Sequence, residues 1–221
     1  MMENIVTNLV RIIGKEEDVK HAIMMLCKIN SNDIITKAIS KSIGYELTDD
    51  TWKLIEWDSS SLPFDFKLLS SNSISFKTFY ESPYDTMLTL SAQNPNVYIT
   101  VYYADEDFGY GTGIYKFIEG EEIDYYSPTN GSSEAAELSL SIIDDNYYLF
   151  EHICDLEEEE LEDGINGSDE VIGALISHIF KNKILCDIYP MQLQEHLLNM
   201  AVQEEDYEYA ADLKKVLDST Y

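Results

Sequence analysis

The stretch that decides the fold is Ser73–Tyr126, "SISFKTFYESPYDTMLTLSAQNPNVYITVYYADEDFGYGTGIYKFIEGEEIDYY". Its opening segment, Ser73–Tyr80, alternates apolar or aromatic side chains with polar ones, which is typical of a half-buried β-strand. Ser82-Pro83 then favours a helix start, because proline is tolerated in the first turn of a helix. Asn94-Pro95 is a stop signal for that helix. The stretch therefore begins as strand followed by helix.

The second half of this stretch predicts antiparallel strands. The segment "NVYITVYYA", Asn96–Ala104, is rich in β-branched and aromatic residues and indicates a second strand. The segment "DEDFGYGTG" (105–113) is a glycine-rich turn, and "GIYKFIEGEEIDYY" (113–126) is a third strand or hairpin arm. Asp105–Gly111 faintly suggests a calcium loop, but it lacks the alternating ligands and the distal Glu of an EF-hand. We interpret it as a hairpin turn.

The N-terminal region repeats the strand–helix pattern. Ile5–Ile13 is rich in β-branched residues and is followed by Gly14, so it predicts a strand. The acidic group Glu16–Asp18 comes next, where a helix dipole favours anions. Helical spacing then follows at Val19, Ile23, Leu26 and Ile29 or Asn30. Between residues 31 and 73 the pattern is weaker: "DIITKAISKSI" (33–43) favours a helix and "SSSLPFDF" (59–66) a loop.

Residues 126–190 predict a mostly helical extension. Ser132 or Ser133 can cap a helix that carries Ala136, Leu138, Leu140 and Ile143. The acidic run "DLEEEELEDGINGSDE" (155–170) indicates a boundary or a solvated linker. The segment "VIGALISHIFKNKIL" (171–185) predicts a helix, and Pro190 begins the last unit. We therefore expect three regions, 1–125, 126–190 and 191–221.

The C-terminal region predicts a helical hairpin. Its sequence is "LQEHLLNMAVQEEDYEYAADLKKVL" (193–217), with an apolar stripe of Leu193, Leu197, Met200 and Ala201. Asp206 can cap the second helix, and Ala210 and Ala211 allow the two helices to approach closely. Such a short hairpin cannot bury enough apolar surface alone. It must pack either on its own domain or on the helices of a partner, and the sequence leaves both open.

Two family resemblances follow from these segments. The N-terminal strand ending in Gly14, the strand–Ser-Pro–helix–Pro–strand block and the acidic, glycine-containing hairpin after it resemble the YubB ferredoxin-like family, over about residues 3–125. This resemblance implies an α+β fold: a ferredoxin-like antiparallel sheet with helices on one face. The family's usual Trp and additional prolines are missing from the block at 80–84. The resemblance implies no catalytic residues.

The second resemblance concerns the hairpin, which is similar to the UVR motif of UvrB, UvrC and several bacterial stress and chaperone partners. The matching positions are Leu197, Met200, Ala201, Val202, Glu205, Asp206, Tyr207, Glu208, Ala210, Ala211 and Leu213. Lys214-Lys215 stand where that family usually has Arg-Asp, so the charged part of the contact differs here. The resemblance implies a protein–protein contact made by the hairpin.

Charge narrows the class of partner. The chain has 14 Lys and Arg against 42 Asp and Glu, a formal net charge of −28, so phosphate backbones and anionic lipid repel it. We expect no direct nucleic-acid binding and no membrane association. A dense acidic surface can also imitate DNA and occupy a DNA-binding enzyme. Three cysteines, Cys27, Cys154 and Cys186, without a CxxC motif fit a reduced, cytoplasmic protein.

The sequence indicates no catalytic, cofactor or metal site. His21, His152, His178 and His196 each occur singly, without the spacing of metal ligands. The glycine-rich "GYGTG" lacks the Lys and helix of a phosphate-binding loop, and its acidic neighbours repel phosphate. Tyrosines gather at positions 98, 102, 103, 110, 115, 125 and 126, but base stacking needs basic neighbours, and we expect only Lys116 near them. Protein contact or core packing suits these tyrosines better.

Our prediction is a non-enzymatic bacterial protein that binds a protein partner or itself through the C-terminal hairpin. The candidate partner-binding residues are Leu197, Met200, Ala201, Tyr207, Ala210, Ala211 and Leu213. One alternative is an acidic DNA mimic or anti-defence protein of a mobile element. A weaker alternative is an enzyme whose site shows no known motif; a pocket that gathers a histidine and two carboxylates would favour it.

Overall fold

The computed structural model describes residues 4–27, 34–44, 57, 62–143, 146–186 and 189–219. The expected helical position at Ile29 or Asn30, and Ser59–Ser61 of the expected loop, lie outside these residues. The chain divides into two compact units. Unit 1 comprises Met1–Glu106 and Gly111–Pro128, and unit 2 comprises Asp107–Tyr110 and Thr129–Tyr221. We describe each unit separately.

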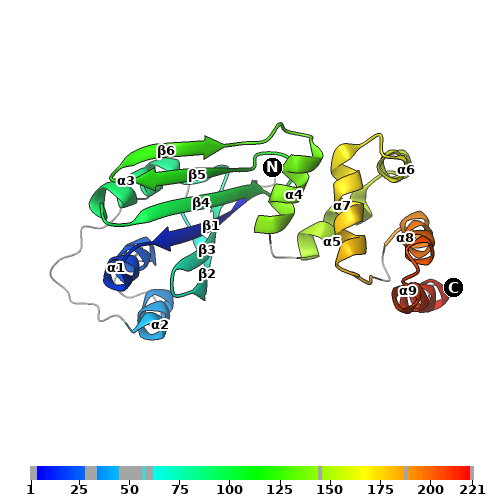
Figure 1. The fold of residues 1–221 in the computed structure, drawn as a ribbon, viewed down its shortest axis with the longest axis horizontal. Coiled ribbons are helices and arrows are strands. Elements are labelled where there is room, and N and C mark those ends of the chain that lie inside the picture. The colour runs from blue at the N-terminus through cyan, green and yellow to red at the C-terminus, as the bar shows by residue number, and fades with distance from the viewer. Residues whose placement is uncertain are drawn as a thin grey trace. The chain divides into compact units, whose positions relative to one another are not determined.

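Unit 1 is built on one antiparallel sheet, in the order β2-β3-β1-β4-β5-β6 (Figure 1). The strands are β1 Ile5–Ile13, β2 Phe64–Ser70, β3 Ser73–Phe79, β4 Tyr98–Asp105, β5 Gly113–Ile118 and β6 Glu121–Tyr126. The helices are α1 Glu16–Cys27, α2 Ile34–Ile43 and α3 Tyr84–Gln93. Helices link β1 to β2 and β3 to β4, which gives the βαββαβ order of a ferredoxin-like fold. The predicted α+β class is confirmed, with β5 and β6 extending the sheet beyond β4.

The core of unit 1 lies between the helices and one face of the sheet. Alternate strand residues point to opposite faces, so Val10 and Ile12 are buried while Arg11 and Ile13 are exposed. The strands contribute Val10, Ile12, Ile74, Phe76, Ile99, Val101 and Phe117 to this core, and the helices contribute Ile23, Met24, Leu26, Ile39, Met87 and Leu90. All three helices therefore cover the same face of the sheet.

Two expectations for unit 1 need correction. The segment expected to be a loop, 59–66, is strand from Phe64 onward. The regular alternation of apolar and polar residues is disturbed in this edge strand, because Asp65 adopts a φ of 51° and the β2–β3 register shifts twice. The segment 113–126 is two strands rather than one, joined at Glu119-Gly120, where φ is 52° and 80°. Positive φ at both central residues fits the tight turn of a two-residue hairpin.

Unit 2 is helical. It contains α4 Ser133–Ile142, α5 Asn146–Asp155, α6 Glu158–Asn166, α7 Glu170–Lys181, α8 Met191–Gln203 and α9 Tyr207–Ser219. Ser132 caps α4 as predicted, because its hydroxyl accepts from the Ala135 amide at 3.2 Å. The main buried apolar residues are Phe108, Leu149, Ile153, Leu161, Leu175, Ile179, Leu193 and Leu197. Across the described part of the chain, no helix is both long enough and apolar enough to cross a membrane.

The acidic run at 155–170 is not a linker but contains helix α6. The Glu157 amide donates to the Glu160 carboxylate at 2.9 Å, and acidic side chains fill the first turn, where the helix dipole stabilises them. Leu161 is buried, and Gly164 lies so close to Ile172 of α7 that a Cβ would collide with it. The run thus has one packed face as well as its solvated one.

The β4–β5 connection contributes Asp107–Tyr110 to unit 2. Phe108 is 1% exposed, and its ring lies edge-on to His152 with centroids 5.9 Å apart. Gly109 has a φ of 82°, and a Cβ there would lie 2.8 Å from the Val171 side chain. The segment 105–113 is therefore the predicted hairpin connection, and its tip also supplies a core residue to the helical unit.

Candidate functional site

The C-terminal hairpin is formed by α8 and α9 with a short turn between them. At the turn, the Asp206 amide donates to the Ala201 carbonyl at 2.8 Å, and Glu205 adopts a φ of 59°. Asp206 caps α9 as predicted, since its carboxylate accepts from the Tyr209 amide at 3.3 Å. The same carboxylate forms an ion pair of 2.7 Å with Lys183, which lies just after α7. Hydrogen bonding to Lys183 lowers the pKa of Asp206, and hydrogen bonding to Asp206 raises the pKa of Lys183.

The hairpin is docked on the rest of unit 2. Tyr209 is 3% exposed, and its ring lies edge-on to Phe180 of α7 at 5.9 Å. Its hydroxyl donates to the Ile184 carbonyl at 3.2 Å. Burial raises the pKa of Tyr209 to about 12. Of the two possibilities that the sequence left open, the structure shows packing on the hairpin's own unit.

Docking divides the seven predicted partner-binding residues into two groups. Leu197, Ala201, Ala210 and Leu213 are buried and hold the hairpin together or against its unit. Met200 is half-buried, whereas Ala211 is exposed and Tyr207 is 67% exposed. The apolar stripe that suggested binding is mostly used inside the unit, because a short hairpin gains stability by burying that stripe. Only Tyr207, Ala211 and part of Met200 can be reached from outside.

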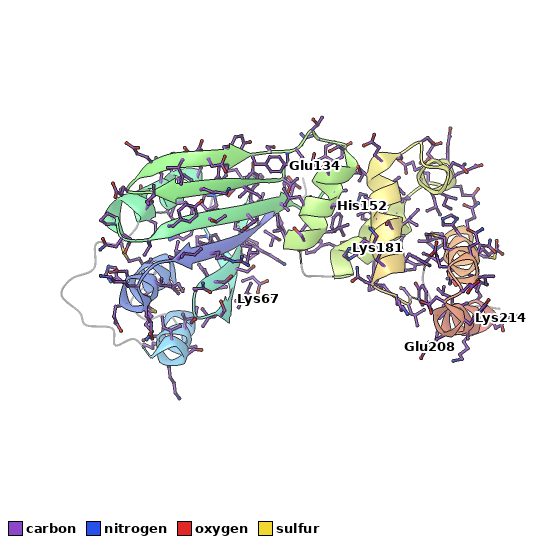
Figure 2. The ribbon with its side chains drawn as sticks, viewed as in Figure 1. Lys67, Glu134, His152, Lys181, Glu208 and Lys214 are labelled. Atoms are coloured by element: carbon purple, nitrogen blue, oxygen red, sulfur yellow. The ribbon has the colours of Figure 1, made fainter. Side chains whose placement is uncertain are left out.

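The exposed end of the hairpin gathers a different set, which we call the hairpin tip: Val202, Glu204, Glu205, Tyr207 and Glu208. All five are exposed. Val202, which sequence reasoning did not select as a contact residue, is 51% exposed. Glu208 lies in the first turn of α9, and Lys214 lies further along the same helix; Figure 2 labels both residues. The tip thus presents one aliphatic and one aromatic side chain among carboxylates.

Unit 2 also contains a cavity of about 290 Å³ between α4 and α7. Its lining residues are Glu137, Leu140, Ser141, Ala174, His178 and Lys181, and Figure 2 labels Lys181 on α7. Burial, followed by the nearby Lys181 charge, lowers the pKa of His178. The Ser141 hydroxyl donates to the Leu138 carbonyl at 2.7 Å. The cavity brings together one histidine and one carboxylate, which falls short of the histidine with two carboxylates that would favour an enzyme.

The other histidines lie in separate places. His152 packs on Phe108, and burial lowers its pKa. His196, on α8, also has a pKa lowered by burial, while His21 lies on α1. Within the residues that the structure describes, no three His, Cys, Asp or Glu side chains converge to hold a metal ion.

The tyrosines of unit 1 lie on both faces of the sheet. Tyr103, Tyr115 and Tyr125 stack across β4, β5 and β6 on the helix-bearing face, with ring centroids 4.8 Å and 5.1 Å apart. Tyr98 and Tyr102 lie on the opposite face with Lys116. The expectation of Lys116 as the only basic neighbour is wrong, because Arg11 lies one strand further across the same row. Only the strand register could bring Arg11 there.

Comparison with known proteins supports the fold. Residues 55–145 match the family described as the ferredoxin-like domain in Api92-like protein. The match runs from before β2 to the end of α4 and spans less than half of the chain. The ferredoxin-like assignment is thereby confirmed. No curated protein and no solved structure matches this chain.

Proposed function

We propose that this chain is a protein-binding adaptor whose partner contacts the hairpin tip. One observation carries the proposal. Val202 and Tyr207 are 51% and 67% exposed on either side of the turn, although the rest of the hairpin's apolar stripe is buried in its own unit. Exposed aromatic side chains are frequent anchors of protein contacts. A docked hairpin also holds its tip in one conformation, which lowers the entropic cost of binding.

The charge around the tip defines the chemistry of the partner. The exposed Glu204 and Glu205 lie between the two apolar residues in the sequence, and the exposed Glu208 follows them, in a chain of formal net charge −28. A partner with a small apolar pocket and a basic rim would complement this tip and would be steered toward it. The UVR-like pattern of the hairpin supports the same role. The YubB-like pattern of the N-terminal region suits a bacterial, cytoplasmic setting for it.

The experiment uses point variants of the full chain rather than a truncation. Removing residues 191–221 would uncover Phe180 and leave the Ile184 carbonyl without the Tyr209 hydroxyl. Any loss of binding would then be confounded with damage to unit 2. The double variant Val202→Ser/Tyr207→Ser changes only exposed side chains. Tyr110→Ser is the matched control, because Tyr110 is 50% exposed in unit 2 away from the hairpin sequence.

Each variant is used for affinity capture from native bacterial lysate, read by quantitative mass spectrometry. We expect a captured protein whose amount falls about tenfold or more with the double variant and does not fall with Tyr110→Ser. Equal capture by all three chains would overturn the proposal. Capture of a DNA-binding enzyme that is equal for all three chains and lost in high salt would instead support the acidic DNA mimic.

A further inference from the structure

The face of the sheet opposite the helices, which we call the open face, carries side chains in ordered rows. In the central row, Arg11 pairs with Thr100, Thr100 with Lys116, and Lys116 with Asp124. Residues paired across antiparallel strands point to the same side. The row therefore runs across β1, β4, β5 and β6 and is polar throughout.

Apolar rows lie on both sides of this polar row. One contains Leu9, Tyr102, Ile114 and Tyr126, and the other contains Ile13, Tyr98 and Ile118 before it ends at Glu121 of β6. Ile13 is 54% exposed and Tyr126 is 40% exposed, while the other five are half-buried. When one face of an antiparallel sheet is solvated, the strand residues that point to that face are usually polar. These rows are apolar instead, and they do not belong to the core that the helices cover.

The charges of the open face differ from those of the chain as a whole. Its cations are Arg11, Lys67, Lys77 and Lys116, and its carboxylates are Asp65, Glu106, Glu121 and Asp124. Asp65 lies 3.6 Å from Lys67 and 3.5 Å from Lys77, and Asp124 lies 2.6 Å from Lys116. Figure 2 labels Lys67 on β2. The open face is therefore close to neutral in a chain of formal net charge −28.

We propose that the open face binds the open face of a second copy of this chain, forming a two-fold symmetric dimer. Two chains of this charge repel each other over most of their surfaces, and a nearly neutral face is where they can approach. The mixed central row is self-complementary, because a two-fold axis can bring Arg11 of one copy toward Asp124 of the other. The apolar rows supply the burial, with the two sheets packed about 10 Å apart.

This proposal does not depend on the hairpin tip, and its consequences are separate. Dimerisation through the sheet uses no residue of the hairpin tip, so the dimer carries two tips. A bivalent adaptor gains apparent affinity for a multivalent partner without any new contact. A dimer built through the hairpin tip would instead consume the proposed partner site.

The test is sedimentation velocity of the full chain from about 1 to 100 μM, a range that brackets micromolar affinity. Tyr126→Glu places a charge on the open face. Its neighbour Tyr125→Glu is the matched control, because Tyr125 is 51% exposed and lies on the opposite face of β6. Arg11→Glu reverses an exposed charge in the central row. Far-UV circular dichroism confirms that each variant is folded.

We expect a concentration-dependent dimer whose Kd rises about tenfold or more with Tyr126→Glu and with Arg11→Glu, and stays unchanged with Tyr125→Glu. We also expect higher salt to strengthen the dimer, because salt screens the repulsion between the acidic chains. A monomeric wild-type chain at every concentration and salt would overturn the proposal. So would a dimer that both open-face variants leave intact, or one lost only with Tyr207→Glu.

Discussion

Tyr209 of α9 donates a hydrogen bond from its hydroxyl to the carbonyl oxygen of Ile184, at 3.2 Å, across 25 residues of chain. This bond connects the second helix of the hairpin to the segment that follows α7. Together with the edge-on contact between Tyr209 and Phe180, it explains why the hairpin is part of unit 2 rather than an independent appendage. The exposed tip is what this docking leaves available.

The first prediction compares two tyrosines on the same helix. Tyr209→Phe removes the hydroxyl from a buried site and leaves the Ile184 carbonyl without that donor, so it should lower the free energy of unfolding by about 1 kcal/mol or more. Tyr207→Phe is the control, because Tyr207 is 67% exposed, and should change it by less than about 0.5 kcal/mol. Urea unfolding followed by circular dichroism measures both. Equal effects would show that the hairpin is not docked as described.

The second prediction concerns two glycines that face each other on α6 and α7. Gly164→Ala should destabilise unit 2 by about 1–3 kcal/mol, because its Cβ would collide with Ile172. Gly173→Ala should stabilise it by about 0.5–1 kcal/mol, because the nearest atom to its Cβ, the Gly164 carbonyl oxygen, is 3.6 Å away. The unfolding temperature should fall with Gly164→Ala and rise with Gly173→Ala, relative to the unsubstituted chain. Shifts of the same sign would contradict the close packing of these helices.

The third prediction uses the ion pair between Asp206 and Lys183. The pKa of Asp206 is lowered from its ordinary value of 3.8, so its contribution to stability is present above that value and lost as pH falls through the lowered pKa. Asp206→Asn keeps the helix cap and removes the charge. It should therefore lower the unfolding temperature at pH 7, with the difference shrinking as the pH falls below 3.8. A difference that is constant with pH would assign the effect to the cap instead.

The fourth prediction concerns His152, whose pKa is lowered because it is buried against Phe108. The unfolded chain takes up this proton more readily than the folded chain, so protonation favours unfolding. Unit 2 should lose stability as pH falls through the ordinary histidine pKa of 6.5, and His152→Gln should flatten that slope. Phe108→Ala should lower the free energy of unfolding by about 3–5 kcal/mol, because Phe108 is a buried core residue. An NMR titration in which His152 has a pKa of 6.5 or above would contradict the burial.

Several features were predictable from the sequence because their signals are local. The strand Ile5–Ile13, the Ser-Pro helix start and the caps at Ser132 and Asp206 depend on neighbouring residues only, and the structure confirms them. The strand at Phe64 was missed because its positive φ and register shifts disturb the alternation. The acidic run was misread because Leu161 and Gly164, its packed residues, are few among many carboxylates.

Features that depend on distant parts of the chain could not be predicted. The sequence shows an apolar stripe on the hairpin, but it does not show whether the chain itself or a partner buries that stripe. In the structure, four of the seven candidate residues are buried within the chain. The row from Arg11 to Lys116 exists only once the register of β1, β4 and β5 is set. Both features became apparent only from tertiary packing.

The central claim, that the hairpin tip contacts a protein partner, is tested most directly by site-specific photo-crosslinking in native bacterial lysate. A photoreactive phenylalanine analogue replaces Tyr207 in one chain and Tyr110, the exposed control, in another. We expect one discrete crosslinked protein from position 207 that position 110 does not give. Identical crosslinking patterns from the two positions, or none from position 207, would contradict the claim.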